Sequence, residues 1–472
     1  MMRFGAAIAA VVGMAGAAVA QAELDGLVEA ERDAAIAIAR DVWGYAELGY
    51  LETQSTARLQ GYLRDAGFEI ETGVAGMPTS FIASAGDGEP VIAILAEFDA
   101  LPGMSQAAVP ERQPVTEGAP GHACGHHLFG AASAAAGVAV ARWLEQSGTA
   151  GTVRVYGTPA EEGGSAKVYM TRAGLFRDVD VVLHWHPNDR NEASPKASTA
   201  NKSGRFTFTG KAAHAASAPD QGRSALDGVE AMNYMVNMMR EHVPQESRIH
   251  YVITDGGDAP NIVPEHAQVY YYVRHPDQER VKALFERVVS AAEGAARGTG
   301  TEMRYEVMHG NFPLLPSETL SAVVHEELVD LGGIGYTAKE TAFANKLRES
   351  LVQPALPLAS SMEIEPSRPE QGMGSTDVGD VSWNVPTVGF GTATWVPGTP
   401  AHSWQAVAAG GTSIGEKGMM LAAKVLARTA ERLYSDAALI RAARTELERD
   451  RGADFVYTPL LGDRDPPLDY RR

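Results

Sequence analysis

The sequence predicts a mostly parallel, doubly wound α/β domain with a smaller ferredoxin-like α+β domain inserted into it. Helical and strand patterns alternate over residues 23–200 and resume over residues 311–440, which is typical of a parallel sheet covered by helices on both faces. Residues 201–310 instead follow a β-α-β-β-α-β order, the ferredoxin-like arrangement. The chain has 472 residues, of which 45% are hydrophobic, and this suffices for two or three domains with a large core.

The first 22 residues have the pattern of an export signal. Arg3 precedes an apolar stretch over residues 4–18, and small residues follow at Ala18, Ala20 and Ala22. A charged start, an apolar region and an Ala-x-Ala site are typical of a signal peptide, here cut after Ala20 or Ala22. The stretch is short and rich in glycine and alanine, which argues against a membrane-spanning helix. We therefore expect an exported protein, periplasmic or secreted.

The first part of the large domain carries the clearest alternation of elements. Apolar residues at helical spacing predict helices, and continuous or alternating apolar runs predict strands. The helices are expected at residues 27–45, 55–66, 128–144 and 166–176. The strands are expected at residues 91–96, 152–157 and 179–183. Gly67 is placed to end the second helix.

The inserted domain and the second part of the large domain follow. Within 201–310 the pattern predicts strands at residues 205–209, 248–254, 268–274 and 301–308, and helices at residues 224–242 and 278–296. Beyond it we expect helices at residues 318–331 and 413–434 and a strand at residues 387–391. Residues 441–472 form a charged tail, whose Pro-rich end is expected to be a surface strap or a frayed end.

Charge and cysteine content exclude several classes of function. The net charge is −19, from 40 Lys and Arg against 59 Asp and Glu, and no block of five or six basic residues occurs. This argues against a nucleic-acid partner or an anionic membrane surface. Cys124 is the only cysteine, so the chain cannot form an internal disulfide. A single thiol in this position is buried, reactive, intermolecular or bound to metal.

Polar side chains follow each predicted strand of the large domain. Ligands of an open α/β sheet bind beyond the carboxyl ends of its strands. The segments at these positions are 97–102 with 121–127, 158–164, 184–187 and 397–404. They contain thiol, imidazole and carboxylate groups, which are the ligands of zinc and related divalent ions. The residues concerned are Cys124, His126, Glu161, Glu162, His184, His186 and His402.

The adjacent carboxylates Glu161 and Glu162 can divide the work, because one can bind metal while the other stays free as a base. Two ions bridged by one group would polarise a carbonyl and deprotonate a water between them. Asp99 could cap a turn or orient a metal-bound histidine. The competing motif, Gly-x-Ser-x-Gly at residues 411–415, requires a catalytic histidine later in the chain, and none follows His402.

Five segments resemble a known family: AEFDALPG, GHACGHHLFG, TPAEEGG, GKAAHA and AHSWQ. They are similar to the dinuclear metallopeptidases and amidohydrolases that include aminoacylases, glutamate-releasing carboxypeptidases, hippurate hydrolases and auxin-conjugate hydrolases. The resemblance covers essentially the whole mature chain, domain insertion included. Within the family, GRSALDGVEAMN, GGDAPNIVP and GSTDVGDVSW look most like the p-aminobenzoyl-glutamate hydrolase branch.

The resemblance implies two divalent ions per chain, zinc or manganese, with cobalt or nickel as alternatives. By position it makes Cys124, His126, Glu162 and His402 metal ligands, Glu161 the general base, and Asp99 the aspartate that orients a ligand. The fifth ligand is His186 or His184, since family members place it either directly before the proline or three residues before it. Our interpretation prefers His186. Glu97 stands where peptidase members have a metal-binding histidine, and His127 replaces a common aspartate.

In the inserted domain, which the resemblance makes a lid and dimerisation domain, three further residues match. His214 matches a histidine that reaches the partner's site in family dimers and stabilises the oxyanion of the reaction. Asn261 is similar to a substrate-contacting asparagine, and Arg274 is a candidate partner for a substrate carboxylate. The resemblance thus implies a homodimeric amidohydrolase of small N-acyl or N-aroyl amino acids. The alternatives are a dipeptidase or exopeptidase on unblocked peptides, and a non-catalytic binding subunit.

Overall fold

A six-stranded sheet forms the centre of the large domain in the computed structural model, which describes residues 21–353 and 355–471. Its strand order is β1-β2-β4-β3-β5-β12. The strands are β1 (Glu69–Thr72), β2 (Phe81–Asp87), β3 (Val91–Ala96), β4 (Gly151–Gly157), β5 (Val181–Asn188) and β12 (Thr387–Ala393). Strands β4, β3, β5 and β12 are mutually parallel, whereas β1 and β2 pair antiparallel. The predicted fold class, a mostly parallel α/β sheet, is confirmed.

Two strands of this sheet differ from the prediction for a simple reason. β1 has only four residues and is largely exposed, and the last residues of β2 are exposed as well, so neither has the apolar run of a buried strand. In β5 the predicted strand ends at residue 183, but the observed one continues to Asn188 because β12 pairs with it along its whole length. The two histidines of this segment therefore lie inside a strand, and the prediction that they follow its end is wrong.

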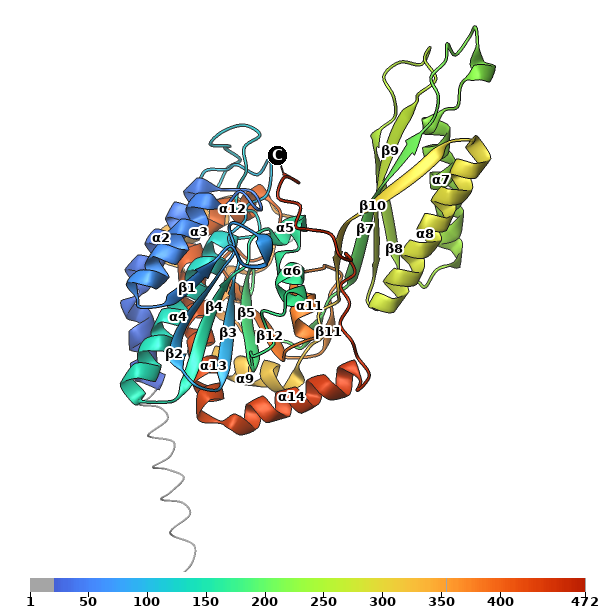
Figure 1. Cartoon of the computed structure of the whole chain (residues 1–472). Coiled ribbons are helices and arrows are strands. Elements are labelled where there is room, and N and C mark those ends of the chain that lie inside the picture. The colour runs from blue at the N-terminus through green and yellow to red at the C-terminus, as the bar shows by residue number, and fades with distance from the viewer. Residues whose placement is uncertain (1–20, 354, 472) are drawn as a thin grey trace, which may run out of the picture.

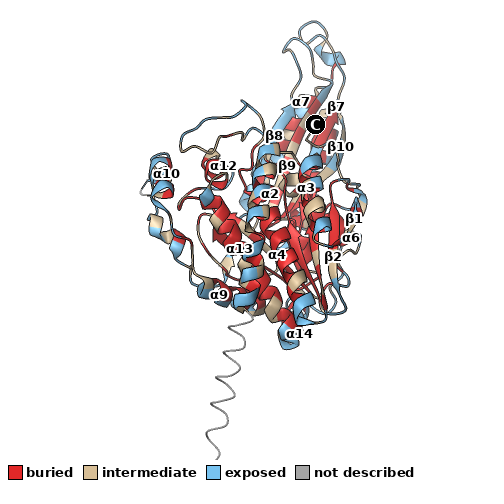
Figure 2. Cartoon of the chain, turned by 90° about the vertical axis from the view of Figure 1, so that its left-hand side faces the viewer, coloured by how far each residue is buried: buried red, intermediate tan, exposed pale blue. Residues whose placement is uncertain are grey.

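Helices cover both sides of the large sheet. In Figure 1, α2, α4 and α13 lie to the left of the sheet, and α6 and α11 lie to its right. Their bounds are α2 (Arg32–Tyr45), α3 (Thr53–Asp65), α4 (His126–Ser147), α5 (Glu161–Gly164), α6 (Ala166–Arg172), α11 (Val378–Ser382) and α13 (Ser413–Ser435). α4 is rich in alanine and buried over most of its length, which allows it to approach the sheet closely (Figure 2).

The inserted domain has the predicted β-α-β-β-α-β order. Its elements are β7 (Ala200–Thr209), α7 (Ala225–Met239), β8 (Arg248–Asp255), β9 (His266–His275), α8 (Gln278–Thr299) and β10 (Glu302–Asn311). The sheet order is β10-β7-β9-β8, antiparallel throughout. Phe206, Phe208, Met232 and Phe285 belong to a hydrophobic core separate from that of the large domain. The two bodies stand side by side, joined at the ends of β7 and β10 (Figure 1).

The remaining segments return to the large domain. They include α9 (Glu318–Leu331), α10 (Ala338–Arg348), α12 (Trp404–Gly410), α14 (Ala437–Arg451), and the short parallel pair β6 (Lys196–Ala197) and β11 (Glu370–Gln371). The sequence analysis did not predict α10 or α14, because few of their residues are apolar and buried.

Most of the predicted export signal, residues 1–20 of 1–22, lies outside the described residues. Among the helices of the described part of the chain, none is long and apolar enough to cross a membrane.

Candidate metal centre

The end of β3 and the start of α4 provide the first part of the site. Glu97 and Asp99 follow β3 directly, and Cys124 and His126 flank Gly125 at the start of α4. Gly125 has a φ of +77°, which glycine adopts without steric cost, and a Cβ at this position would come within 2.6 Å of Pro187. Glycine thus lets Cys124 and His126, two residues apart, serve one site next to β5.

Three groups of metal-ligand side chains lie together in this region. The ligand atoms within each group are within 4.8 Å of one another. The groups are Cys124, His126 and His186; Cys124, Glu162 and His402; and Glu97, His126 and Glu161. Because Cys124 and His126 each belong to two groups, the three groups form one continuous cluster. Segments that are almost 300 residues apart in the chain meet there.

The donor set of the cluster fits divalent metal ions. Cys124 Sγ lies 3.3 Å from His186 Nε2, and His402 Nε2 lies 2.9 Å from Glu162 Oε1. The buried atoms Glu97 Oε2 and His126 Nε2 are 3.1 Å apart, and neither has a hydrogen-bond partner among the described residues. Buried polar atoms are normally paired, so unpaired atoms of ligand type that converge on one point fit a bound cation.

Asp99 connects two members of the cluster. Its Oδ1 accepts a hydrogen bond of 2.8 Å from His126 Nδ1, and its Oδ2 accepts one of 2.9 Å from the backbone N–H of Glu162. With the proton held on Nδ1, the other ring nitrogen of His126 keeps its lone pair for a metal ion. The geometry therefore suits the orienting function that the sequence predicts for Asp99.

Electrostatics at Cys124 favours its thiolate. Burial by itself would raise the pKa of the Cys124 thiol, but the neighbouring His186 and His126 outweigh it and bring this pKa well below its usual range. Hydrogen bonds to Cys124 and Glu162 raise the pKa of His402 to about 10. The thiolate is the form of cysteine that binds metal. The cluster is thus arranged for anionic sulfur and carboxylate ligands.

The glutamate pair lies on α5, a single distorted turn. Ala160 before it and Ser165 after it have φ values of +53° and +61°, and Glu162 itself is not helical, with ψ of 66°. The turn is held from below by Glu52, which is fully buried and whose Oε1 accepts from the backbone N–H of Ala160 at 2.8 Å. Burial raises the pKa of Glu52 to about 8. Non-glycine residues in such conformations persist when surrounding contacts hold them.

Glu161 differs from Glu162 in its surroundings. Glu162 faces His402, whereas burial and the carboxylates of Glu97 and Glu162 raise the pKa of Glu161 well above its usual range. A carboxyl group with a raised pKa beside a cation site is typical of acid–base catalysts.

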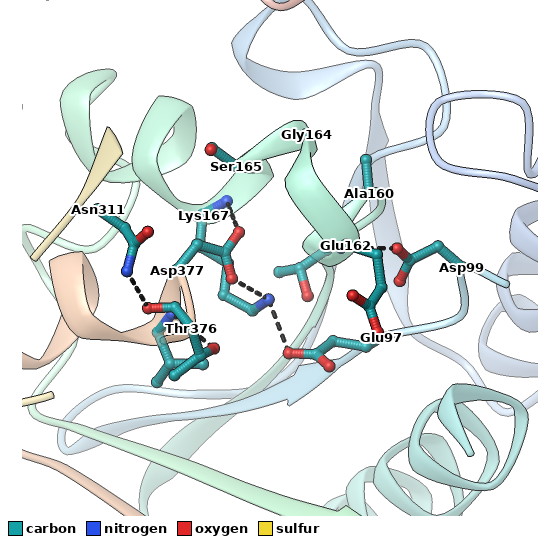
Figure 3. Close-up of polar contacts among 12 residues, drawn as sticks. Glu97, Asp99, Ala160, Glu162, Gly164, Ser165, Lys167, Asn311, Thr376 and Asp377 are labelled. Carbon is teal, nitrogen blue, oxygen red and sulfur yellow. Dashed lines mark hydrogen bonds and ion pairs between the residues drawn. The ribbon is translucent and has the colours of Figure 1, made fainter. Parts of the chain in front are cut away.

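Sequence reasoning missed one prominent part of the site, the lysine at position 167. Lys167 is fully buried, and its Nζ lies 2.7 Å from Glu97 Oε1 and 2.7 Å from Asp377 Oδ1 (Figure 3). Burial opposes its charge, but Asp377 and Glu97 outweigh it and raise the pKa of Lys167 above its usual range. A lone lysine among apolar residues directly after the paired glutamates was the available sequence signal.

His184 and His186 lie on the same face of β5 but in different surroundings. Trp185 between them donates to the carbonyl of Phe129 in α4, so both histidines point to the opposite face. His186 is in the cluster, whereas His184 is in none of the three groups. Burial lowers the pKa of His184 to about 3, and its Nε2 has no partner among the described residues. Both line a cavity of about 280 Å³ beside β12.

The inserted-domain residues lie away from the cluster within this chain. His214 and Asn261 lie on adjacent loop segments, since the N–H of Ala215 donates to the carbonyl of Asn261. These loops lie at the end of the inserted domain that projects beyond the large one (Figure 1). His214 Nδ1 accepts from the N–H groups of Ala216 and Ser217 at 3.2 Å, so a neutral ring carries its proton on Nε2.

Arg274 lies on β9, in register with Asn201 of β7, with its guanidinium over the ring of Tyr272. Its Nε has no hydrogen-bond partner among the described residues. Arg274 therefore offers a free donor at the base of the inserted domain, and it is in none of the three groups of ligand side chains.

Comparison with known proteins covers both domains. Residues 198–299 match the family of peptidase dimerisation domains, M20_dimer. The chain is 39% identical to one subunit of the p-aminobenzoyl-glutamate hydrolase of Escherichia coli (strain K12), over 93% of this chain and 96% of that protein. It is 29% identical to the Xaa-Arg dipeptidase of Mus musculus, over 87% and 88% of the two chains.

A solved structure of a dinuclear metal-binding peptidase from the M20 family of Bacillus subtilis shares the fold, with a TM-score of 0.54 and 20% identity. The match covers 84% of this chain and 99% of that one.

Proposed function

This chain belongs to the M20 family of dinuclear metallopeptidases and amidohydrolases, and we propose from that premise that it hydrolyses the amide bond of N-acyl or N-aroyl amino acids. It is a metal-dependent hydrolase. The similarity to the p-aminobenzoyl-glutamate hydrolase of Escherichia coli supports an aroyl-glutamate as the kind of substrate to test first. The observation that carries the proposal is a cluster of ligand side chains with one further buried glutamate, Glu161, next to it.

In this proposal Cys124, His126, Glu162, His186 and His402 hold the metal. Divalent ions bound there would polarise the scissile carbonyl and lower the pKa of water. Glu161 would accept the proton from the attacking water at its carboxylate and return it to the leaving nitrogen. Asp99 keeps the Nδ1 proton of His126 in place throughout.

The inserted domain would complete the site in a homodimer. The Nε2–H of His214, presented by a partner subunit, would donate to the carbonyl oxygen as its charge grows. Asn261 on the adjacent loop and Arg274 would contact the substrate, the latter through a carboxylate. Val252 and Ile253 of the edge strand β8 and Tyr234 and Met238 of α7 are exposed, which supports this face as the dimer surface.

Two further parts of the proposal rest on chemistry and sequence. A thiolate with imidazoles suits zinc, and manganese is the second candidate, because metal availability as well as ligand type decides which ion is bound. The signal pattern supports export to the periplasm or beyond. The similarity to an Xaa-Arg dipeptidase favours dipeptides as the second substrate class.

The deciding experiment measures hydrolysis of N-aroyl-glutamates, N-acetyl amino acids and unblocked dipeptides by the mature protein. Each is assayed before chelation, after chelation and after metal return. We expect cleavage of the blocked substrates that chelation abolishes and metal restores. Cleavage of dipeptides alone would move the assignment to a dipeptidase. A protein that binds metal but turns over nothing would favour a non-catalytic subunit.

The two β5 histidines give a matched pair of variants. His186→Ala removes an imidazole beside Cys124 and is expected to lower the metal content, counted by elemental analysis, below that of the wild type. His184→Ala is expected to keep the wild-type metal content, because its ring is in none of the ligand groups. The reverse outcome would make His184 the ligand.

A further inference from the structure

We propose that the end of the chain positions the metal-binding turn. We name residues 452–471 the C-terminal strap, and we infer that Tyr470 and Arg471 are positioning residues that hold the main chain of Glu162. The inference rests on the proposed function, in which the Glu162 side chain is a metal ligand. In Figure 1 the strap leaves α14, passes the base of β7 and β10, and ends beside α5.

The strap is docked along its course by specific contacts. Leu460 and Leu461 are buried. Arg172 of α6 donates to the carbonyls of Gly462 and Arg464 at 2.9 and 2.8 Å. Arg464 in turn donates to the carbonyls of Val307 and Met308 in β10, both at 2.6 Å. The strap is therefore a built element of the structure, fixed to both the large domain and the root of the inserted one.

The end of the strap bonds to the glutamate turn. The Tyr470 hydroxyl donates to the carbonyl of Glu162 at 3.1 Å, and Arg471 Nη2 donates to the same carbonyl at 2.8 Å. The Tyr470 ring packs edge-on against Tyr50 at a centroid distance of 5.7 Å. A Cβ on Gly49 would clash with the Tyr470 hydroxyl, so glycine leaves the space that this hydroxyl occupies.

The turn needs such partners because it is not a regular helix. The positive φ values of Ala160 and Ser165 and the ψ of Glu162 remove it from helical geometry. Each end is held by a separate contact, from Glu52 to the N–H of Ala160 and from the Tyr50 hydroxyl to the carbonyl of Gly164 at 2.6 Å. The strap holds the middle, at the residue whose carboxylate faces His402 and Cys124.

The consequence is that the strap sets how well Glu162 is aimed. Partners that orient a metal ligand without touching the metal typically contribute about 10–100-fold to metal affinity or activity. With Tyr470 and Arg471 removed, the backbone of Glu162 can relax and the carboxylate loses its direction. The side chains that bind substrate are not altered, so the effect should fall on metal affinity and kcat rather than on KM.

The test compares Tyr470→Phe, Arg471→Ala and the double variant in the full chain. Zn²⁺ and Mn²⁺ are titrated into metal-free protein by calorimetry, and kcat and KM are measured with whichever substrate of the panel is cleaved. We expect the double variant to bind metal about 10-fold more weakly or worse, with a lower kcat and a KM within twofold of the wild type. Arg471→Lys, which keeps one donor, should recover part of the affinity.

Tyr457→Phe is the matched control, because it removes a tyrosine hydroxyl on the same strap that bonds to Asp380 at 2.7 Å, away from the turn. It should lower the Tm and leave metal affinity unchanged. The proposal is overturned if the double variant binds metal as the wild type does, or if Tyr457→Phe weakens metal binding equally. Glu162→Gln is measured in parallel: if it keeps full metal affinity, the ligand assignment fails, whatever the strap variants do.

Discussion

Replacing Glu161 by Gln should remove almost all turnover while the protein keeps its metal. The amide has nearly the shape of the carboxylate but cannot accept the proton from water, and general acid–base catalysis is worth about 10²–10⁴-fold. We expect kcat to fall within that range and KM to change little. The measurement is steady-state kinetics together with metal content by elemental analysis on the same preparation.

Glu162→Gln is the matched control for this variant, since the two glutamates are neighbours on α5 but face different groups. It should lose metal as well as activity. If Glu161→Gln instead kept near-normal turnover with metal bound, Glu161 would not be the base. If Glu161→Gln lost metal as Glu162→Gln does, the division of work between the two carboxylates would be wrong.

Replacing Lys167 by Met should destabilise the fold strongly. Lys167 places one positive charge between the buried carboxylates Glu97 and Asp377, and methionine has a similar length but no charge. Removing one partner of a buried ion pair typically costs about 3–5 kcal/mol, because the remaining charge is left uncompensated. We expect a loss of this size in the free energy of unfolding, measured by denaturant titration of the metal-free protein.

Two further variants define the origin of this loss. Lys167→Met combined with Asp377→Asn should recover part of the stability, because it removes one of the uncompensated carboxylates. Lys196→Met breaks an exposed pair with Glu192 at 3.2 Å and should cost less than about 1 kcal/mol. Equal stability of Lys167→Met and the wild type would show that the buried carboxylates do not depend on Lys167.

Local patterns predicted the strongest elements of the fold. Residues 91–96 and 318–331 form β3 and α9 with the predicted bounds, because a continuous apolar run and a helical apolar period are properties of short segments. β1, α10 and α14 were missed for the same reason, since their few buried residues leave no pattern. The length of β5 depended on pairing with β12, which is more than 190 residues away in the chain.

The sequence by itself determined the fold class, the domain insertion and the chemical types of the site, because strand and helix periods and the motifs around Cys124, Glu161 and Glu162 are local. It named both β5 histidines but could not place them, since their surroundings depend on α4. Only the tertiary structure decided that Lys167 meets Glu97 and Asp377, and that Tyr470 and Arg471 meet Glu162. Such contacts join residues up to about 300 positions apart, and no local period encodes them, because they exist only once the packed sheet and helices bring the segments together.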